Sequence, residues 1–136
     1  MTANGTAVIA KARASIGEAR YATQIQAGHH ALIADEHAAL GGKDAGPAPF
    51  ALLLSALGSC TAITLKMYAE RKQWPVEAVE VDLRYLKTGD EARIERGLTL
   101  KGPLSDEQRA RMADIAERTP VTLAIKGGVP INTELR

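Results

Sequence analysis

Cysteine is almost absent from this chain of 136 residues, with Cys60 as its one example. A single cysteine excludes a disulfide within the chain. The first residues, Met1 to Gly5, also lack the basic and then apolar pattern of a secretory signal. Because disulfide-free proteins without such a signal are typical of reducing compartments, the sequence predicts a cytoplasmic protein.

Aromatic residues are scarce as well, at 4% against 46% hydrophobic residues in total. The core must therefore be built from Ala, Leu, Ile and Val, with Phe50 and Trp74 as rare large fillers. The length suits a single domain spanning residues 1–136. A core of small side chains in a domain of this size buries little apolar surface. Additional burial against a second copy is therefore expected, which favours a homodimer.

The chain has no large excess of one charge, because it contains 17 basic and 16 acidic residues. This balance excludes the basic footprint of a nucleic-acid or anionic-membrane partner. The longest uncharged stretch, residues 45–65, contains Gly46, Pro47, Pro49 and Gly58. Such a stretch is atypical of a transmembrane helix and indicates buried core.

The first third of the chain predicts strands over residues 6–11, 21–26 and 30–34, arranged as an antiparallel meander. Residues 41–49, rich in Gly and Pro, then form a loop that leads into a helix, with Pro49 in its first turn. Residues 50–72 are apolar on nearly every face up to Lys66, which predicts a helix buried on all sides. Gly58-Ser59 predicts a break, so that a second helix begins near Cys60.

Alternating apolar residues predict a second hairpin, with strands around residues 79–85 and 94–100 and an irregularity at Gly97. A capping box of Ser105 and Gln108 opens a helix that should end near Thr119. Residues 121–125 and 129–135 look like final strands. Antiparallel sheets wrapped around central helices place the chain in the α+β class.

The thiol of Cys60 is the main candidate for chemistry. A helix that begins beside it would favour the thiolate, which is the nucleophilic form. The structural alternative is a buried cysteine that acts as a small hydrophobic residue. Arg20, Arg93 and Arg96 lie in or next to predicted strands, and each could approach a thiolate.

The three histidines offer no metal site. His29 and His30 are adjacent, so on a strand they point to opposite faces, one buried and hydrogen-bonded and the other exposed. With His37 they do not give a standard zinc spacing around Cys60. We expect neither a metal nor a cofactor.

The run from Gly46 to Ala69, with GPAPFALLLSALGSCTAITLKMYA, closely resembles the core motif of the OsmC/Ohr family (osmotically inducible protein C and organic hydroperoxide resistance). Residues 71–77, Ile94-Glu95-Arg96 and the helix 105–118 resemble the second half of that family. The resemblance implies an OsmC-like fold: an intertwined homodimer in which two antiparallel sheets enclose central helices. It also implies a redox site at each end of the interface.

In active members of this family a first cysteine attacks an organic hydroperoxide, and Cys60 matches it. An arginine stabilises the thiolate, and His29 or the nearby Arg20 stands where that arginine is expected. The acidic residue that holds the arginine is replaced by Phe50 and Ala51. The second cysteine, which forms a disulfide, is replaced by Thr119.

The resemblance therefore implies a thiol-dependent, peroxiredoxin-like oxidoreductase of the oxidative stress response that reduces organic hydroperoxides through Cys60. With one cysteine, such an enzyme needs an external thiol as reductant. The alternative is a non-catalytic homodimer that binds a small apolar ligand or a partner in a pocket lined by Cys60, Phe50 and Trp74. A one-cysteine thiol carrier or redox sensor is a third reading.

Overall fold

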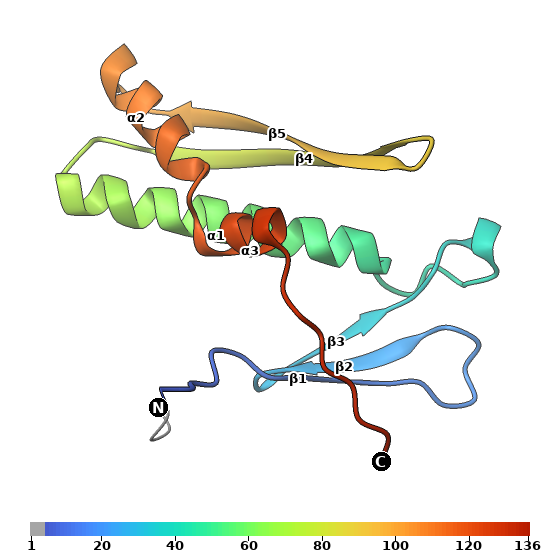
Figure 1. Ribbon diagram of the computed structural model, residues 1–136. Coiled ribbons are helices and arrows are strands. Elements are labelled where there is room, and N and C mark those ends of the chain that lie inside the picture. Colours follow the sequence, from blue (N-terminus) through green and yellow to red (C-terminus); the bar gives the residue numbers. More distant parts are fainter. Residues whose placement is uncertain (1–4) are drawn as a thin grey trace. The chain divides into compact units, whose positions relative to one another are not determined.

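The computed structural model describes residues 5–136, and the chain divides after Leu52 into two compact units. The first unit contains three short strands, and the second contains helices and a long hairpin (Figure 1). The fold is α+β with antiparallel sheets, as the sequence predicts. The observed order is βββ-α-ββ-αα, rather than one that ends in a strand.

The first unit holds an antiparallel sheet in the order β1-β2-β3, formed by Ala12–Ser15, Thr23–Ala27 and His30–Ala34. The predicted meander is confirmed, but the prediction of a first strand over residues 6–11 is wrong. Ala12 pairs with Ala27, the last residue of β2. Beyond this pair the chain turns at Gly28, whose N–H donates to the carbonyl oxygen of Lys11 at 3.0 Å, and the pairing of β1 with β2 ends there.

A buried carboxylate organises the loop after β3, which includes the short 3-10 helix η1 (Ala38–Leu40). Asp35 is 3% exposed, and its oxygens accept the N–H groups of Glu36 at 2.7 Å, Lys43 at 3.2 Å and Ala45 at 3.1 Å. The backbone passes so closely here that a Cβ on Gly42 would lie 2.0 Å from the carbonyl oxygen of Glu36. The Gly-rich loop is thus built around Asp35.

Helix α1 (Pro49–Lys72) begins at Pro49, as predicted, but continues without interruption for 24 residues. The expected break at Gly58-Ser59 and the second helix starting near Cys60 are both wrong. In the second unit, a Cβ on Gly58 would lie 2.9 Å from Cδ1 of Leu83. Glycine at this position permits close approach of α1 to a strand, and it does not end the helix.

Strands β4 (Ala78–Thr88) and β5 (Glu91–Lys101) form the predicted hairpin, with continuous pairing from Ala78–Lys101 to Thr88–Glu91. Gly97 lies opposite Asp82 within this register, so the expected irregularity is wrong. Helix α2 (Asp106–Ala116) follows. Its capping box of Ser105 and Gln108 is confirmed, although the helix ends three residues before Thr119.

The last segment differs most from the prediction. Residues 121–125 belong to helix α3 (Pro120–Gly127) and not to a strand, and residues 129–135 form no strand either. Pro120 occupies the first turn, where its fixed φ favours a helix, and Thr119 is extended in the N-cap position. The β-branched residues Val121, Thr122 and Ile125 favour a strand, but this propensity gives way to the helix start signal at Pro120.

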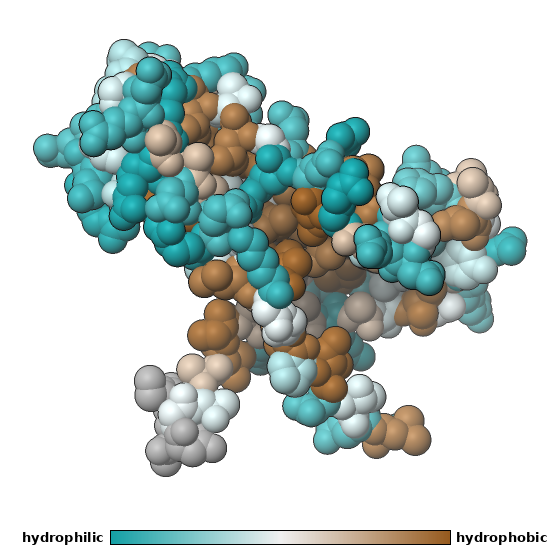
Figure 2. Space-filling view, turned by 45° about the horizontal axis from the view of Figure 1, so that its top comes forward, coloured by the Kyte–Doolittle hydropathy of each residue, from teal (hydrophilic) through white to brown (hydrophobic). Residues whose placement is uncertain are grey.

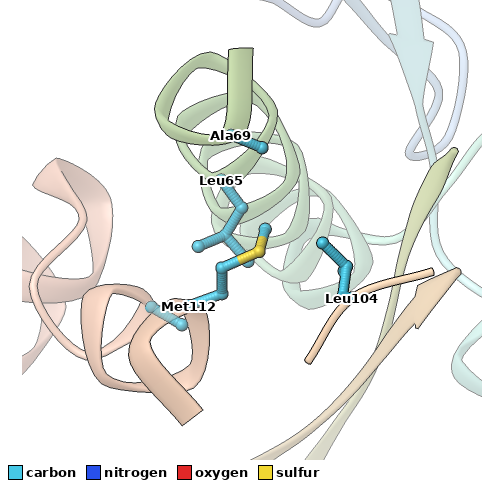
Figure 3. Close-up of a cluster of buried hydrophobic side chains, with 5 residues drawn as sticks. Leu65, Ala69, Leu104 and Met112 are labelled. Carbon is cyan, nitrogen blue, oxygen red and sulfur yellow. The ribbon is translucent and has the colours of Figure 1, made fainter. Parts of the chain in front are cut away.

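One face of α1 packs into the core of the second unit with α2 (Figure 3). The fully or nearly buried members are Leu65, Ala69, Leu104, Met112 and Ala116. Other apolar side chains of the helix are exposed, including Ile63 at 54% and Met67 at 64%. In the single chain, the prediction of a helix buried on all sides is therefore wrong. Figure 2 shows hydrophobic residues at the surface of the molecule.

By length and composition alone, α1 is also apolar enough to cross a membrane, and 22% of its most apolar stretch is buried. Because core helices of soluble proteins meet the same criterion, this property alone is weak evidence for a membrane span.

Candidate functional site around Cys60

The sulfur of Cys60 lies at the beginning of α3. Cys60 is partly buried in the middle of α1, and the backbone N–H of Val121 donates to its Sγ at 3.5 Å. Val121 is the second residue of α3, where backbone N–H groups have no partner within the helix. The helix terminus expected beside the thiol is therefore present, but it belongs to α3 and not to a second half of α1.

Two threonines fix the first turn of α3. Thr119 is 1% exposed, and its hydroxyl oxygen lies 2.6 Å from that of Thr122. The Thr122 hydroxyl also contacts the carbonyl oxygen of Ala116 at 3.4 Å. Thr119, which the sequence resemblance matches to the second cysteine of the family, is thus two residues from the amide that contacts Cys60.

Arg96 connects α1 and α3, the two helices that carry Cys60 and Val121. Its Nη1 donates to the hydroxyls of Thr61 at 3.0 Å and Thr122 at 2.8 Å. Its Nη2 donates to the carbonyl oxygen of Ala116 at 2.9 Å. Thr61 follows Cys60 in α1, and Thr122 follows Val121 in α3, so one side chain with 11% exposure holds both helices next to the thiol contact.

Arg96 has an acidic partner. Glu117 contacts Nη2 of Arg96 at 3.1 Å and Nζ of Lys126 at 2.9 Å. The hydrogen bond from Lys126, followed by that from Arg96, lowers the pKa of the Glu117 carboxyl. The family resemblance points to positions 50 and 51 for the acid, so Glu117 was not predicted, although it lies two residues before Thr119.

Arg20 and His29 lie in the first unit. The guanidinium of Arg20 is 5.5 Å from the centre of the Tyr21 ring. His29 lies in the turn before β3, and its ring centre is 4.1 Å from that of His30. Both histidines are exposed, so the expectation that one imidazole is buried and that the two point to opposite faces is wrong. A turn at His29 removes the alternation that a strand would impose.

The aromatic candidates have different environments. Phe50 is 57% exposed in the first turn of α1. Trp74 packs against the core cluster, and its ring meets that of Tyr68 edge-on at 5.4 Å between centres. Within residues 5–136, no group of three His, Cys, Asp or Glu side chains could hold a metal ion.

A cavity of about 460 Å³ lies beside this network in the second unit. Arg96, Glu117 and Thr122 contribute to its wall, together with side chains of β4, β5 and α3. Cys60 does not line it.

Comparison with known families adds evidence from outside the chain. The family of OsmC-like proteins matches residues 41–134. No curated protein sequence matches the chain. Solved structures do match the chain, and three of them show how far the TM-score and the sequence identity vary.

An OsmC-like protein of Mycoplasma pneumoniae has a TM-score of 0.76 at 18% identity, with 90% of each chain covered. An organic hydroperoxide resistance protein OsmC of Legionella pneumophila has a TM-score of 0.65 at 19% identity, covering 90% of this chain and 92% of that one. The organic hydroperoxide resistance protein OhrB of Bacillus subtilis has a TM-score of 0.58 at 23% identity, covering 95% and 98%. At these identities the likeness is one of fold.

Proposed function

Because this chain belongs to the OsmC-like protein family, we propose that it is a thiol-dependent peroxidase that reduces organic hydroperoxides through Cys60. The observation that carries the proposal is the contact between the Val121 N–H and the Cys60 sulfur. An N–H at a helix start stabilises negative charge, which the reactive form of a thiol carries. The names of the Legionella and Bacillus proteins, which refer to hydroperoxide resistance, support the same substrate class.

The proposed reaction needs two stages. First, the Cys60 thiolate attacks the terminal oxygen of ROOH, the O–O bond breaks, and the alkoxide takes up a proton and leaves as an alcohol. Cys60 is oxidised to sulfenic acid. An external thiol then forms a mixed disulfide with loss of water, and a second thiol releases reduced Cys60 and the oxidised reductant.

The positive charge near the sulfur has several candidate sources. Arg96, held by Glu117, acts as a positioning residue for the first turn of α3, since it bonds the neighbours of both Cys60 and Val121. Arg20 and His29 remain our candidates for the cation that stabilises the thiolate. Thr119 takes the place of the resolving cysteine, which is why the second stage is assigned to an external thiol.

We further propose that the protein works as an intertwined cytoplasmic homodimer. Large apolar residues are exposed on the single chain, among them Ile63 and Met67 on α1. A second copy that covered this face would remove the apolar surface from water. Phe50, also exposed on α1, is proposed to contribute to the substrate site.

The deciding experiment measures the consumption of cumene hydroperoxide with dithiothreitol as reductant, in wild type and in Cys60→Ser. We expect turnover in wild type alone, and dimedone should label Cys60 after peroxide treatment. Turnover that persists in Cys60→Ser would refute the proposed mechanism. A folded wild type without turnover would favour the non-catalytic binding protein instead.

A further inference from the structure

The cavity of about 460 Å³ in the second unit has the size of a small-molecule site. It is lined by α1, β4, β5 and α3, and Cys60 is not part of its wall. Inferences about its ligand therefore do not rest on the proposed peroxidase activity.

One part of the cavity wall is apolar. Leu57 of α1, Tyr85 of β4, Ile94 of β5 and Ile125 of α3 contribute to it. Leu57 is 4% exposed, whereas Ile125 is 36% exposed and marks the side open to solvent. A wall of this kind suits an aliphatic or aromatic body, because burying apolar surface is favourable.

The remaining wall carries an excess of positive charge. Arg93, Arg96 and Lys126 line the cavity with a single carboxylate, Glu117. Arg93 contacts Glu95, which lies outside the cavity, through its Nε at 3.2 Å, and it shares this carboxylate with Arg84. Arg96 and Lys126 likewise share Glu117 between them. Arg96 and Lys126 carry two positive charges, and Glu117 carries one negative charge. One positive charge at the cavity wall is therefore not neutralised by this carboxylate.

The cations also differ in what they can offer a ligand. The two terminal nitrogens of Arg96 already donate to protein oxygens, so Arg96 contributes a fixed charge. Lys126 is 54% exposed and Arg93 is 58% exposed, and both are long side chains at the solvent side. These two are placed to meet an anionic head group directly.

From this arrangement we propose that the cavity binds an amphipathic monoanion, namely an aliphatic or aryl carboxylate. Its carboxylate lies at Lys126 and Arg93, in the field of Arg96, and its apolar body lies against Leu57, Ile94 and Ile125. The ligand supplies the negative charge that Glu117 alone does not provide.

The test compares three probes of equal chain length, octanoate, 1-octanol and octylammonium, by titration of backbone amide NMR signals of the full chain. Octanoate should bind saturably, with shifts at Ile94, Thr122 and Ile125, and about tenfold more tightly than octanol. Octylammonium should bind no more tightly than octanol. Equal affinity for octanoate and octanol, or shifts confined to the exposed α1 residues Ile63 and Met67, would overturn the proposal.

Matched lysine variants test the role of charge. Lys126→Gln should weaken octanoate binding by about three- to tenfold and leave octanol binding unchanged. Lys101→Gln is the control, because Lys101 has similar exposure and an equivalent ion pair with Glu80, at 3.0 Å, but does not line the cavity. Arg93→Gln is a second variant at an exposed position and should also weaken octanoate binding. Octanoate affinity that is the same in wild type, Lys126→Gln and Arg93→Gln would rule out the proposed head-group site.

Discussion

The N–H of Val121 points to the sulfur of Cys60 across 3.5 Å, although the two residues are 61 positions apart in the sequence. Pro120 starts the helix that carries this amide, and Arg96 bonds to the residues that follow Cys60 and Val121. The surroundings of the thiol therefore depend on three segments that meet only in the folded chain.

Introducing a second thiol at Thr119 should restore an internal disulfide. Thr119→Cys places a sulfur two residues from the amide that contacts Cys60, within the buried start of α3. After stoichiometric peroxide, we expect loss of both thiols and a mass lower by two hydrogens. The double variant Cys60→Ser/Thr119→Cys has one thiol and serves as the control. Two thiols that remain reactive after peroxide would contradict the proposed proximity.

Removing Arg96 should destabilise the second unit. In Arg96→Ala the buried hydroxyls of Thr61 and Thr122 lose a charged donor, and the expected loss is about 2–3 kcal/mol of unfolding free energy. Urea unfolding measures this difference. Arg93→Ala on the same strand is the control, since an exposed ion pair contributes less than about 1 kcal/mol. Similar losses in the two variants would refute the structural role of Arg96.

Arg96 should also affect Cys60 chemistry in proteins that remain folded. Arg96→Lys keeps the charge but cannot bond to four oxygens in the fixed geometry of a guanidinium. We therefore expect slower alkylation of Cys60 by iodoacetamide at neutral pH than in wild type, with circular dichroism unchanged. An unchanged alkylation rate would remove Arg96 from the proposed site.

The loop around Asp35 should make stability depend on acid pH. The N–H of Ala45, together with those of Glu36 and Lys43, lowers the pKa of the Asp35 carboxyl below its ordinary value of 3.8. A carboxylate with a lowered pKa stabilises the fold above its unfolded pKa, and this contribution is lost as the pH falls through the folded pKa. Asp35→Asn should therefore melt at a lower temperature than wild type at pH 7, and the gap should shrink at lower pH.

Thermal unfolding between about pH 7 and pH 2 measures this gap, over the range in which Asp carboxyls titrate. Asp90→Asn, in the exposed hairpin turn, is the control and should show no such gap. A gap for Asp35→Asn that stays constant with pH would show that the carboxylate charge is not involved.

The same loop should reject a side chain at Gly42. A Cβ there would meet the carbonyl oxygen of Glu36, so Gly42→Ala forces the backbone apart, at an expected cost of about 1–3 kcal/mol. Gly17→Ala is the matched control, because nothing lies within 4 Å of a Cβ at Gly17. Equal stability of the two variants in thermal unfolding would show that the loop adapts.

The exposed face of α1 should carry the dimer contact. Wild type is expected to sediment as a dimer at low micromolar concentration, and Met67→Glu should shift it to monomer by placing a charge among apolar side chains. Lys87→Glu, at an exposed site on β4, should leave the dimer intact. A stable folded monomer of wild type would refute the proposed homodimer.

Local patterns in the sequence were enough to predict the meander, the start of α1 at Pro49, the second hairpin and the capping box of Ser105. Each of these depends on residues close together in the chain, such as a proline in a first turn or a hydroxyl three residues from an amide. Cys60 is identified as the one thiol of the sequence, and the family resemblance adds Thr119 as the match to a second cysteine, but neither observation tells what surrounds these residues here.

Contacts between distant segments decided the rest. Gly58 looked like a helix break because its partner, Leu83 of β4, cannot be recognised from neighbouring residues. Residues 121–125 have strand propensity, yet they form α3, whose first turn is held by Arg96 and by the hydroxyl pair of Thr119 and Thr122. The role of Glu117 likewise follows from the approach of β5 and α3, since an ion pair depends on distance in space and not on separation in sequence.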